Sequence, residues 1–145
     1  MKTDLTLLLD LALARTAVVR DVDNMLGAHH GLGLSDLALL IELEAAPQGR
    51  MRRVELANRL AVTTSGVARQ LGQLERRKIV TRESNPADAR LALAVLTEAG
   101  EKLLTQVLAT AEEEAEQVLA KHWSPAERQR LGKFLGAVRR SGSTR

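Results

Sequence analysis

The sequence contains no cysteine and no tyrosine, and its only aromatic residues of the Phe, Trp and Tyr class are Trp123 and Phe134. Because cysteine is missing, disulfides, thiolate metal sites and thiol-based redox sensing are excluded, and the composition suits a reducing cytoplasm. No apolar run reaches the ~18 residues that a membrane helix needs, so we expect no membrane association. The N-terminus carries acidic Asp4 and Asp10 without a basic segment or small-residue cleavage site, so we expect no signal peptide.

Motifs that carry enzyme chemistry are also absent. The sequence has no Gly-rich phosphate loop, no serine nucleophile elbow and no His/Cys pair, so we predict that the protein is not an enzyme and uses no cofactor. The candidate metal ligands in the sequence are the adjacent residues His29 and His30. Consecutive residues rarely bind one ion well, and no ligand spacing supports this pair, so no metal site is predicted.

What is present favours a single helical domain with an uneven charge. The 145 residues are enough for one domain with a sizeable core, and abundant leucine and alanine favour helices. Residues 50–90 contain ten Lys or Arg and four acidic residues, a local charge of +6, whereas the rest of the chain sums to −3. Such a segment is typical of a surface that binds a polyanion, with a merely solvated basic surface as an equal alternative.

Two helices are predicted before the basic segment. Apolar residues at helical spacing extend over Leu5–Leu26, and the glycines from Gly27 onward are expected to end this helix. Ser35 is expected to cap a second helix, which Pro47 stops.

Two further helices are predicted after the basic segment. Thr97 is the expected N-cap of a long helix that reaches about His122. Ser124-Pro125 then starts a last helix, because proline suits the first turn. The apolar stripe of this last helix consists of Leu131, Phe134, Leu135 and Val138.

Within the basic segment, a short helix, a turn and a second helix are predicted. The short helix covers Arg53–Leu60, with Val54, Ala57 and Leu60 on one apolar face. Ala61-Val62 makes a tight turn, and Thr63 or Thr64 caps the second helix, which reaches about Arg77.

The second of these helices has two different faces. Val67, Leu71 and Leu74 recur at four and three residues and form a single apolar stripe. The residues away from this stripe are polar: Thr64, Ser65, Arg69, Gln73 and Arg76. A helix that reads the DNA major groove needs this division between anchoring and recognition.

A hairpin is predicted directly after the two helices. Its strands are Ile79–Glu83 and Leu91–Leu96, and the sequence shows no other convincing strand. The connection Ser84–Ala89 is rich in turn-forming Asn, Pro and Asp. Arg90 lies near the tip of the hairpin, where a guanidinium is electrostatically favoured in a narrow DNA minor groove.

Four motifs stand in this region: Leu60-AVTTSGVARQLGQL-Glu75, Ile79-Val-x-Arg82, Asn85-PADA-Arg90 and Leu96-Thr-x-x-Gly100. Together they resemble the MarR family of bacterial transcription regulators. The resemblance runs by motif from about residue 34 to residue 100, and by helix order over the whole chain. The combined pattern is specific, although each motif alone is weak.

The resemblance implies a mainly α fold with a small β-hairpin wing. It implies one unit over residues 1–145, with a winged helix-turn-helix lobe at 34–100 and dimerisation helices at 1–30 and 101–145. It also implies a homodimer that binds a pseudo-palindromic DNA site. A small, often anionic aromatic ligand would release the DNA by binding between the dimerisation helices and a lobe.

The resemblance also assigns roles to residues. Arg69 matches the arginine of the family's recognition helix, and Asp88 and Arg90 match the wing's acid and arginine, where the acid orients the arginine. We expect further DNA contacts from Arg52, Arg53, Arg76, Arg77, Thr64, Ser65 and Gln73, with ordinary solvated positions as an equal alternative for the four arginines. Near the family's effector pocket, the candidate ligand-binding residues are His29, His30, Arg15 and Arg20, with ordinary surface positions as the alternative.

Three positions depart from the family pattern. Asn85 replaces the usual Asp before Pro, and Lys78 stands where a Gly is common, which leaves a left-handed turn to a residue with a side chain. Ala68 stands where Thr is common, so one expected contact to DNA is absent. Because the contact at Ala68 is missing, we expect this helix to read base edges directly through few side chains.

The sequence therefore predicts a sequence-specific DNA-binding regulator in the cytoplasm, a repressor that acts as a homodimer. Its predicted partners are double-stranded DNA, a second copy of the chain and a small-molecule effector. Two alternatives stay open: a low-specificity architectural DNA-binding protein, and a winged-helix module for protein–protein interaction.

Overall fold

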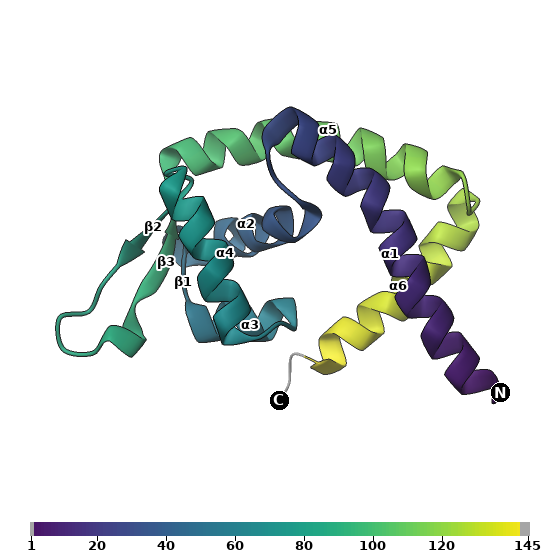
Figure 1. Cartoon of the computed structure of the whole chain (residues 1–145), viewed down its shortest axis with the longest axis horizontal. Helices are drawn as coiled ribbons and strands as arrows, with labels where there is room; N and C mark the ends of the chain where they lie inside the picture. The colour runs from purple at the N-terminus through teal and green to yellow at the C-terminus, as the bar shows by residue number, and fades with distance from the viewer. Residues whose placement is uncertain (1, 143–145) are drawn as a thin grey trace.

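A computed structural model of the chain describes residues 2–142 and has a mainly helical fold with one small sheet (Figure 1). The elements are α1 (Thr3–His30), α2 (Leu34–Ala45), β1 (Arg50–Arg52), α3 (Arg53–Leu60), α4 (Thr64–Arg76), β2 (Val80–Glu83), β3 (Leu93–Leu96), α5 (Glu98–Ala120) and α6 (Pro125–Gly142). Short 3-10 turns cover Pro47–Gly49 and Ala89–Leu91. Across residues 2–142, no helix combines the length and the apolar character needed to cross a membrane.

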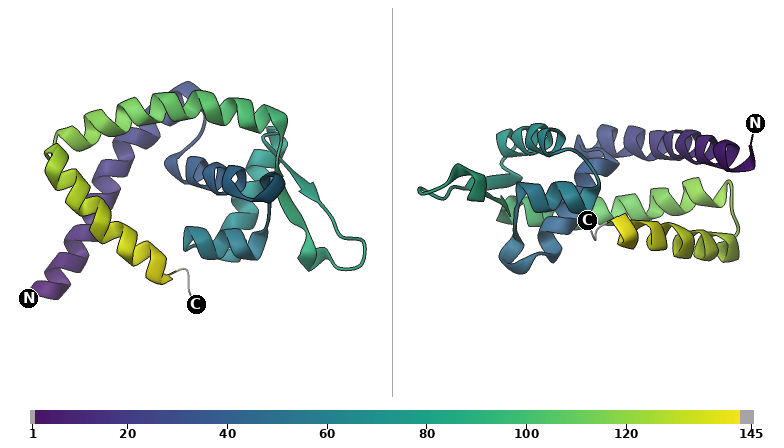
Figure 2. Two further views of the ribbon diagram at one scale, coloured as in Figure 1. Left: turned by 180° about the vertical axis from the view of Figure 1, so that it is seen from behind. Right: turned by 90° about the horizontal axis from the view of Figure 1, so that it is seen from below.

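The chain divides into a lobe and a helical extension. Elements α2 to β3 form the lobe, from which the β2–β3 hairpin projects (Figure 1). Helix α5 leads away from the lobe, and α6 turns back from its far end. Seen from below, α1 lies on one side of the α5–α6 corner (Figure 2), and it packs mainly on α5.

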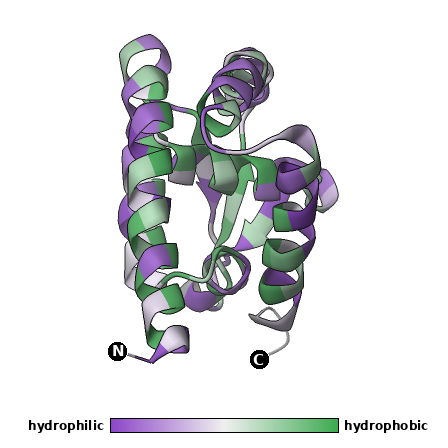
Figure 3. Cartoon of the chain, turned by 90° about the vertical axis from the view of Figure 1, so that its right-hand side faces the viewer, coloured by the Kyte–Doolittle hydropathy of each residue, from purple (hydrophilic) through white to green (hydrophobic). Residues whose placement is uncertain are grey.

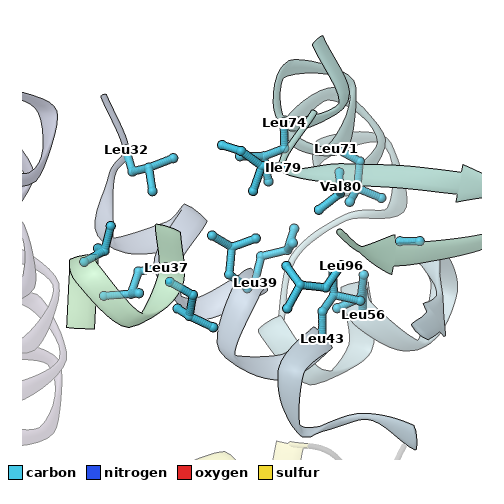
Figure 4. Packing of buried hydrophobic residues seen from close by; sticks show 14 of the residues in the cluster. Leu32, Leu37, Leu39, Leu43, Leu56, Leu71, Leu74, Ile79, Val80 and Leu96 are labelled. Atoms are coloured by element: carbon cyan, nitrogen blue, oxygen red, sulfur yellow. The ribbon is translucent and has the colours of Figure 1, made fainter. Parts of the chain in front are cut away.

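The hydrophobic core lies in the lobe and is almost entirely aliphatic (Figure 4). Helix α2 forms its centre, because α2 packs against α1, α3, α5 and the sheet. The fully buried leucines of α2 are joined there by Leu56 of α3, Leu71 of α4 and Leu104 of α5. By contrast, α1 has only Val22 and Leu26 among its buried residues, so most of this long helix lies outside the core.

The sheet has three antiparallel strands in the order β1-β3-β2. Ala94 of β3 pairs with Met51 of β1 on one side and with Arg82 of β2 on the other. Both predicted hairpin strands are present but begin later than expected, at Val80 and at Leu93, since Ala89–Leu91 forms a 3-10 turn; β1 was missed. Its three residues are too few to show the period-two alternation by which a strand is recognised in a sequence.

The ends of two helices differ from the prediction. Helix α1 continues past Gly27 to His30, because the left-handed residue that ends it is Gly31, with φ 65°. Helix α2 is capped by Gly33 instead of Ser35, since the Asp36 carboxylate accepts the Gly33 N–H at 2.9 Å. On α3, Val54 is 55% exposed and Leu56 takes the buried position, so the expected apolar face was also wrong at Val54.

The predicted turns around α4 are confirmed. Thr63 caps the helix, with its hydroxyl accepting the Gly66 N–H at 3.0 Å. Ala61 before the helix and Lys78 after it both adopt left-handed conformations, with φ 54° and 60°. The three predicted anchors Val67, Leu71 and Leu74 are buried. Both ends and the inward face of α4 thus follow from signals in the nearby sequence.

Thr97 joins the start of α5 to the turn after α4. Its hydroxyl accepts the Gly100 N–H at 3.0 Å and lies 2.7 Å from the Lys78 carbonyl and 2.9 Å from the Ile79 carbonyl. A Cβ atom at Gly100 would overlap the Ile79 carbonyl and would lie 2.7 Å from Leu96 Cδ1. The Thr-x-x-Gly motif thus allows α5 to cross the strands at close range.

We expect Gly100→Ala to destabilise the fold by about 2–3 kcal/mol, because backbone has to move to admit the methyl group. Gly72→Ala is the matched control. A Cβ at Gly72 meets nothing within 4 Å, so this change should stabilise the protein by about 0.5–1 kcal/mol through helix propensity. Chemical denaturation measures both values. Equal effects of the two substitutions would contradict the close crossing at Gly100.

Candidate nucleic-acid interface

Helix α4 turns its polar face outward from the lobe. Its buried anchors are at most 2% exposed, while the opposite face consists of exposed Thr64, Ser65, Arg69, Gln73 and Arg76. All five were predicted as the reading face of this helix. At the N-terminal end, the Ser65 hydroxyl lies 3.3 Å from that of Thr63, so the capped end also presents hydroxyl groups.

The wing loop is folded by its own side chains. Asn85 Oδ1 accepts the Ala87 N–H at 2.9 Å, and the Asn85 carbonyl accepts the Asp88 N–H at 3.2 Å. An Asp or Asn side chain can make this local turn equally well, which accounts for the mild change from the family's Asp at position 85.

The Asp88 carboxylate holds Arg90 at three points. One oxygen accepts the Arg90 N–H at 2.9 Å and its Nε at 3.1 Å, and the other accepts an Nη at 3.1 Å. The Arg90 side chain remains 89% exposed. The guanidinium therefore projects into solvent in a fixed direction, so little side-chain entropy remains to be lost on binding.

The same contacts set the protonation of Asp88. Hydrogen bonds from the Arg90 side chain, and then from its backbone N–H, lower the pKa of Asp88 below its ordinary value. A lowered pKa means that the pair is fully formed at neutral pH and is lost only as the pH falls through that lowered pKa. Asp88 is thus charged and able to pair with Arg90 across the physiological pH range.

The basic residues of the segment divide into paired and unpaired ones. Arg50 binds Glu83 at 2.7 Å, Arg59 lies 3.5 Å from Glu42, and Arg82 lies 3.7 Å from Glu75. Within residues 2–142, no acidic partner lies within ion-pair distance of Arg52, Arg69 or Arg76. The charge that faces solvent is thus concentrated on fewer residues than the sequence count suggests.

A hollow of about 470 Å³ lies between α3 and the wing. It brings Arg52 together with Asp88 and Arg90, beside Val54 and Asn58. Arg53 is half-buried and instead lines a small crevice with Glu75 and Arg82. Of the two adjacent arginines, only Arg52 shares a surface with the wing.

Arg77 has a different environment from the one expected. Its guanidinium donates to the Gly31 carbonyl at 2.8 Å and to the His30 carbonyl at 2.9 Å. These carbonyls belong to the C-terminal end of α1, so Arg77 is engaged inside the chain, and we leave it out of the proposed interface. The sequence offers no signal for this contact, because it joins residues 46 and 47 positions apart.

A second hollow, of about 620 Å³, lies between α1 and the lobe. Arg15 and Arg20 line it from α1, and Ser35, Val62 and Gln70 line it from the lobe. Asp23 adds one negative charge to the wall. A site of this kind suits a small anion with an apolar body.

The two histidines predicted beside this hollow lie elsewhere. His29 Nδ1 bonds the Met25 carbonyl of its own helix at 3.0 Å, and His30 Nε2 bonds the Thr110 hydroxyl of α5 at 3.2 Å. Neither histidine is among the residues that line the hollow, since both lie at the C-terminal end of α1, beyond Asn24. Among the described residues, no three His, Asp or Glu side chains are placed to hold a metal ion.

Comparison with known proteins places this arrangement in a family. A sequence model of the MarR family matches residues 30–91. The chain is 33% identical over 101 residues to YxaD, an uncharacterized HTH-type transcriptional regulator of Bacillus subtilis (strain 168), and this alignment spans 70% of this chain and 68% of YxaD.

Solved structures agree with the sequence match. Sco3205, a MarR family transcriptional regulator from Streptomyces coelicolor solved in complex with DNA, is similar with a TM-score of 0.81 and 25% identity, over 95% of this chain and 87% of that one. BpsR of Bordetella bronchiseptica gives a TM-score of 0.75 with 23% identity, over 88% and 89% of the two chains. The wing, the outward face of α4 and these relatives together show that the chain belongs to the MarR family of DNA-binding transcriptional regulators, which are not enzymes.

Proposed function

We propose that the protein is a homodimeric repressor that acts in the cytoplasm on a pseudo-palindromic operator. Helix α4 enters the major groove, and Arg90 of the wing enters the adjacent minor groove. The observation that carries this proposal is the bidentate Asp88–Arg90 pair, which presents an exposed guanidinium in the same lobe as the exposed polar side chains of α4. The solved complex of Sco3205 with DNA supports the same use of the fold.

The contacts are of two kinds in this proposal. Arg69 and Gln73 are in a position to bond base edges, since they lie in the middle of the exposed face of α4. Thr64, Ser65, Arg52 and Arg76 flank that region, and we assign them to phosphates, whereas Arg53 lies in its crevice with Glu75 and Arg82. Phosphate contacts depend on charge, so the affinity should fall steeply as salt rises.

Dimerisation is supported by apolar surface that the chain leaves open. The N-terminal half of α1 exposes several leucines, among them Leu13 at 69%, and α6 exposes Phe134 at 65% with Leu135 and Val138 beside it. Helices α1 and α6 lie outside the lobe, and their ribbons carry hydrophobic positions along their length (Figure 3). Clusters of large exposed apolar residues mark interaction surfaces, and we assign those on α1 and α6 to a second copy of the chain.

A small anionic effector is the proposed signal, and the hollow lined by Arg15 and Arg20 is its site. The DNA binding of BpsR is regulated by 6-hydroxynicotinic acid, an aromatic acid that would suit two arginines and apolar walls. Gln70 of α4 lines the same hollow and bonds Asp36 of α2 at 2.9 Å. A ligand there would touch α1 and the recognition helix at once.

The proposal is tested by selecting binding sites from a random duplex library at two salt concentrations. We expect enrichment of an inverted repeat with half-sites about 10 base pairs apart, because two lobes related by a two-fold axis read the same sequence twice. Retention without an enriched motif would favour a low-specificity architectural protein, in line with Ala68 and Gly72 on the reading helix. No retention would favour a protein-interaction module.

On the selected operator, Arg90→Ala should weaken binding with a small loss of sequence preference, whereas Arg69→Ala should lose preference more strongly. A residue that bonds a base edge contributes about 1–3 kcal/mol of discrimination, and a minor-groove arginine adds affinity without reading one base. Competition assays with mutated operators measure both. Lys121→Ala, at the α5–α6 corner far from the wing, is the control and should bind normally. Unchanged affinity of Arg90→Ala at moderate salt would rule out the wing contact.

Phe134→Glu should convert the dimer into a folded monomer, because the new charge would be buried without a partner in the interface. Val54→Glu is the matched control, since Val54 is comparably exposed but lies on the lobe. Sedimentation velocity gives the mass, and circular dichroism shows whether each variant is folded. A folded Phe134→Glu dimer would remove α6 from the proposed interface.

Addition of 6-hydroxynicotinate or benzoate should raise the melting temperature of the wild-type protein, because a ligand that binds only the folded state stabilises it. Arg20→Ala should lose most of this shift and Lys121→Ala should keep it. A shift that is the same in wild type and in Arg20→Ala places the ligand outside this hollow.

A further inference from the structure

The C-terminal end of the recognition helix is tied to the end of α1 by one side chain. Arg77 donates two charge-assisted hydrogen bonds, one to Gly31 and one to His30, at 2.8 and 2.9 Å. No intervening element takes part in this contact. Both helix ends lie along α5 (Figure 1), and α1 is the helix that carries the exposed leucines of the proposed dimer interface.

The backbone after α4 fixes where Arg77 points. Lys78 is left-handed, the Lys78 N–H bonds the Glu75 carbonyl at 2.9 Å, and the Ile79 N–H bonds the Leu74 carbonyl at 3.1 Å. This is the Schellman pattern of a helix end, with its two apolar residues, Leu74 and Ile79, both buried. The position of Arg77 is therefore set by the core instead of by a flexible tail.

The end of α1 is suited to receive a cation. The last carbonyls of a helix carry partial negative charge and lack partners within the helix. Gly31 is left-handed, and a Cβ there would lie 3.3 Å from an Nη atom of Arg77, so the guanidinium fits closely against it. His30 is held in turn by Thr110 of α5. Arg77 thus caps α1 from a different element.

A second connection between α1 and α4 runs through α2. Asp23 of α1 accepts the Leu34 N–H at 2.7 Å, and Asp36 accepts both the Gly33 N–H and the Gln70 side chain of α4 at 2.9 Å. These bonds hold the middle of α4, while Arg77 holds its end. Because α4 is held both at its middle and at its end, these contacts define its direction relative to α1.

We propose that Arg77 is a positioning residue that sets the angle of the recognition helix relative to α1, and hence the separation of the two recognition helices in the dimer. This inference rests on the proposed function. It gives Arg77 a role different from its neighbour Arg76, whose side chain has no hydrogen bond or ion pair within residues 2–142 and which we assign to phosphate. The two adjacent arginines therefore form a natural pair of test and control.

The first test measures the separation of the recognition helices without DNA. The chain has no cysteine, so Gln73→Cys gives one spin label on each recognition helix of the dimer. Double electron–electron resonance should show a narrow distance distribution in the otherwise wild-type protein and in Arg76→Gln. Arg77→Gln should broaden or shift it, and Arg77→Lys, which keeps the charge but not the two-pronged donor, should restore it in part.

The second test measures DNA binding on operators with altered half-site spacing. Arg77→Gln should bind the selected operator about three- to tenfold more weakly, the effect of losing hydrogen bonds of modest net strength. It should lose less affinity than wild type when the spacing is changed by one base pair. Its slope of log affinity against log salt should equal that of wild type, whereas Arg76→Gln should reduce the slope by about one phosphate contact.

Distinct outcomes separate this inference from the proposed function. An Arg77→Gln protein with the wild-type distance distribution, wild-type spacing preference and a lowered salt slope would overturn the positioning role and make Arg77 a phosphate contact. If the wild-type protein gave no distance between labels, or no spacing preference, the homodimer on a two-fold operator would fail before Arg77 is considered.

Discussion

The apolar stripe of α4 is the constraint on which the rest of this structure depends. Val67, Leu71 and Leu74 are all but fully buried in the core around α2, and each such side chain contributes about 1.5–3 kcal/mol relative to an exposed position. Because the stripe is narrow, it allows only one rotation of the helix about its axis. The burial that stabilises the lobe therefore also turns Arg69 and Gln73 outward. No further interaction is needed to direct these two side chains toward solvent.

The ends of α4 are fixed by backbone turns that the core also determines. Ala61 and Lys78 accept left-handed conformations without being glycine, which is unfavourable for residues with a Cβ. At Lys78 the turn is supported by the buried pair Leu74 and Ile79 and by the Thr97 hydroxyl on the adjacent carbonyls. The departure from the family's common glycine is thus compensated locally, and the chain gains an exposed cation beside the helix end.

Much of the lobe could be predicted from the sequence because its signals are local. The α4 stripe, the Thr63 and Thr97 caps and the Asp88–Arg90 spacing each lie within a few residues, and each was found in the structure. The failures have the opposite character. Strand β1 is too short for a pattern of its own, and the start of α2 is set by Asp36 reaching back to a glycine that sequence preference ranks below serine.

The candidate site could likewise be predicted only where its signals are local in the sequence. The exposed face of α4 follows from its stripe, but the roles of Arg53 and Arg77 depend on which distant element lies opposite. Arg53 faces Glu75 and Arg82 in a crevice, and Arg77 faces the end of a helix that begins more than seventy positions earlier. In the sequence these two arginines look the same as Arg52 and Arg76, because charge and helical position do not encode tertiary neighbours.

Helix α1 carries the exposed leucines, part of the hollow and the acceptor carbonyls of Arg77. Its N-terminal half exposes leucines, its middle lines the hollow with Arg15 and Arg20, and its C-terminal end receives Arg77. A packed helix moves as a nearly rigid body, so a change at any one of these places is transmitted to the others. A ligand that shifts α1 relative to the lobe would have to strain the Arg77 contact, which ends on the recognition helix, or the bond between Asp23 of α1 and the Leu34 N–H at the start of α2. In the proposed dimer, the helix that joins the two subunits would thus also orient the proposed DNA-reading surface.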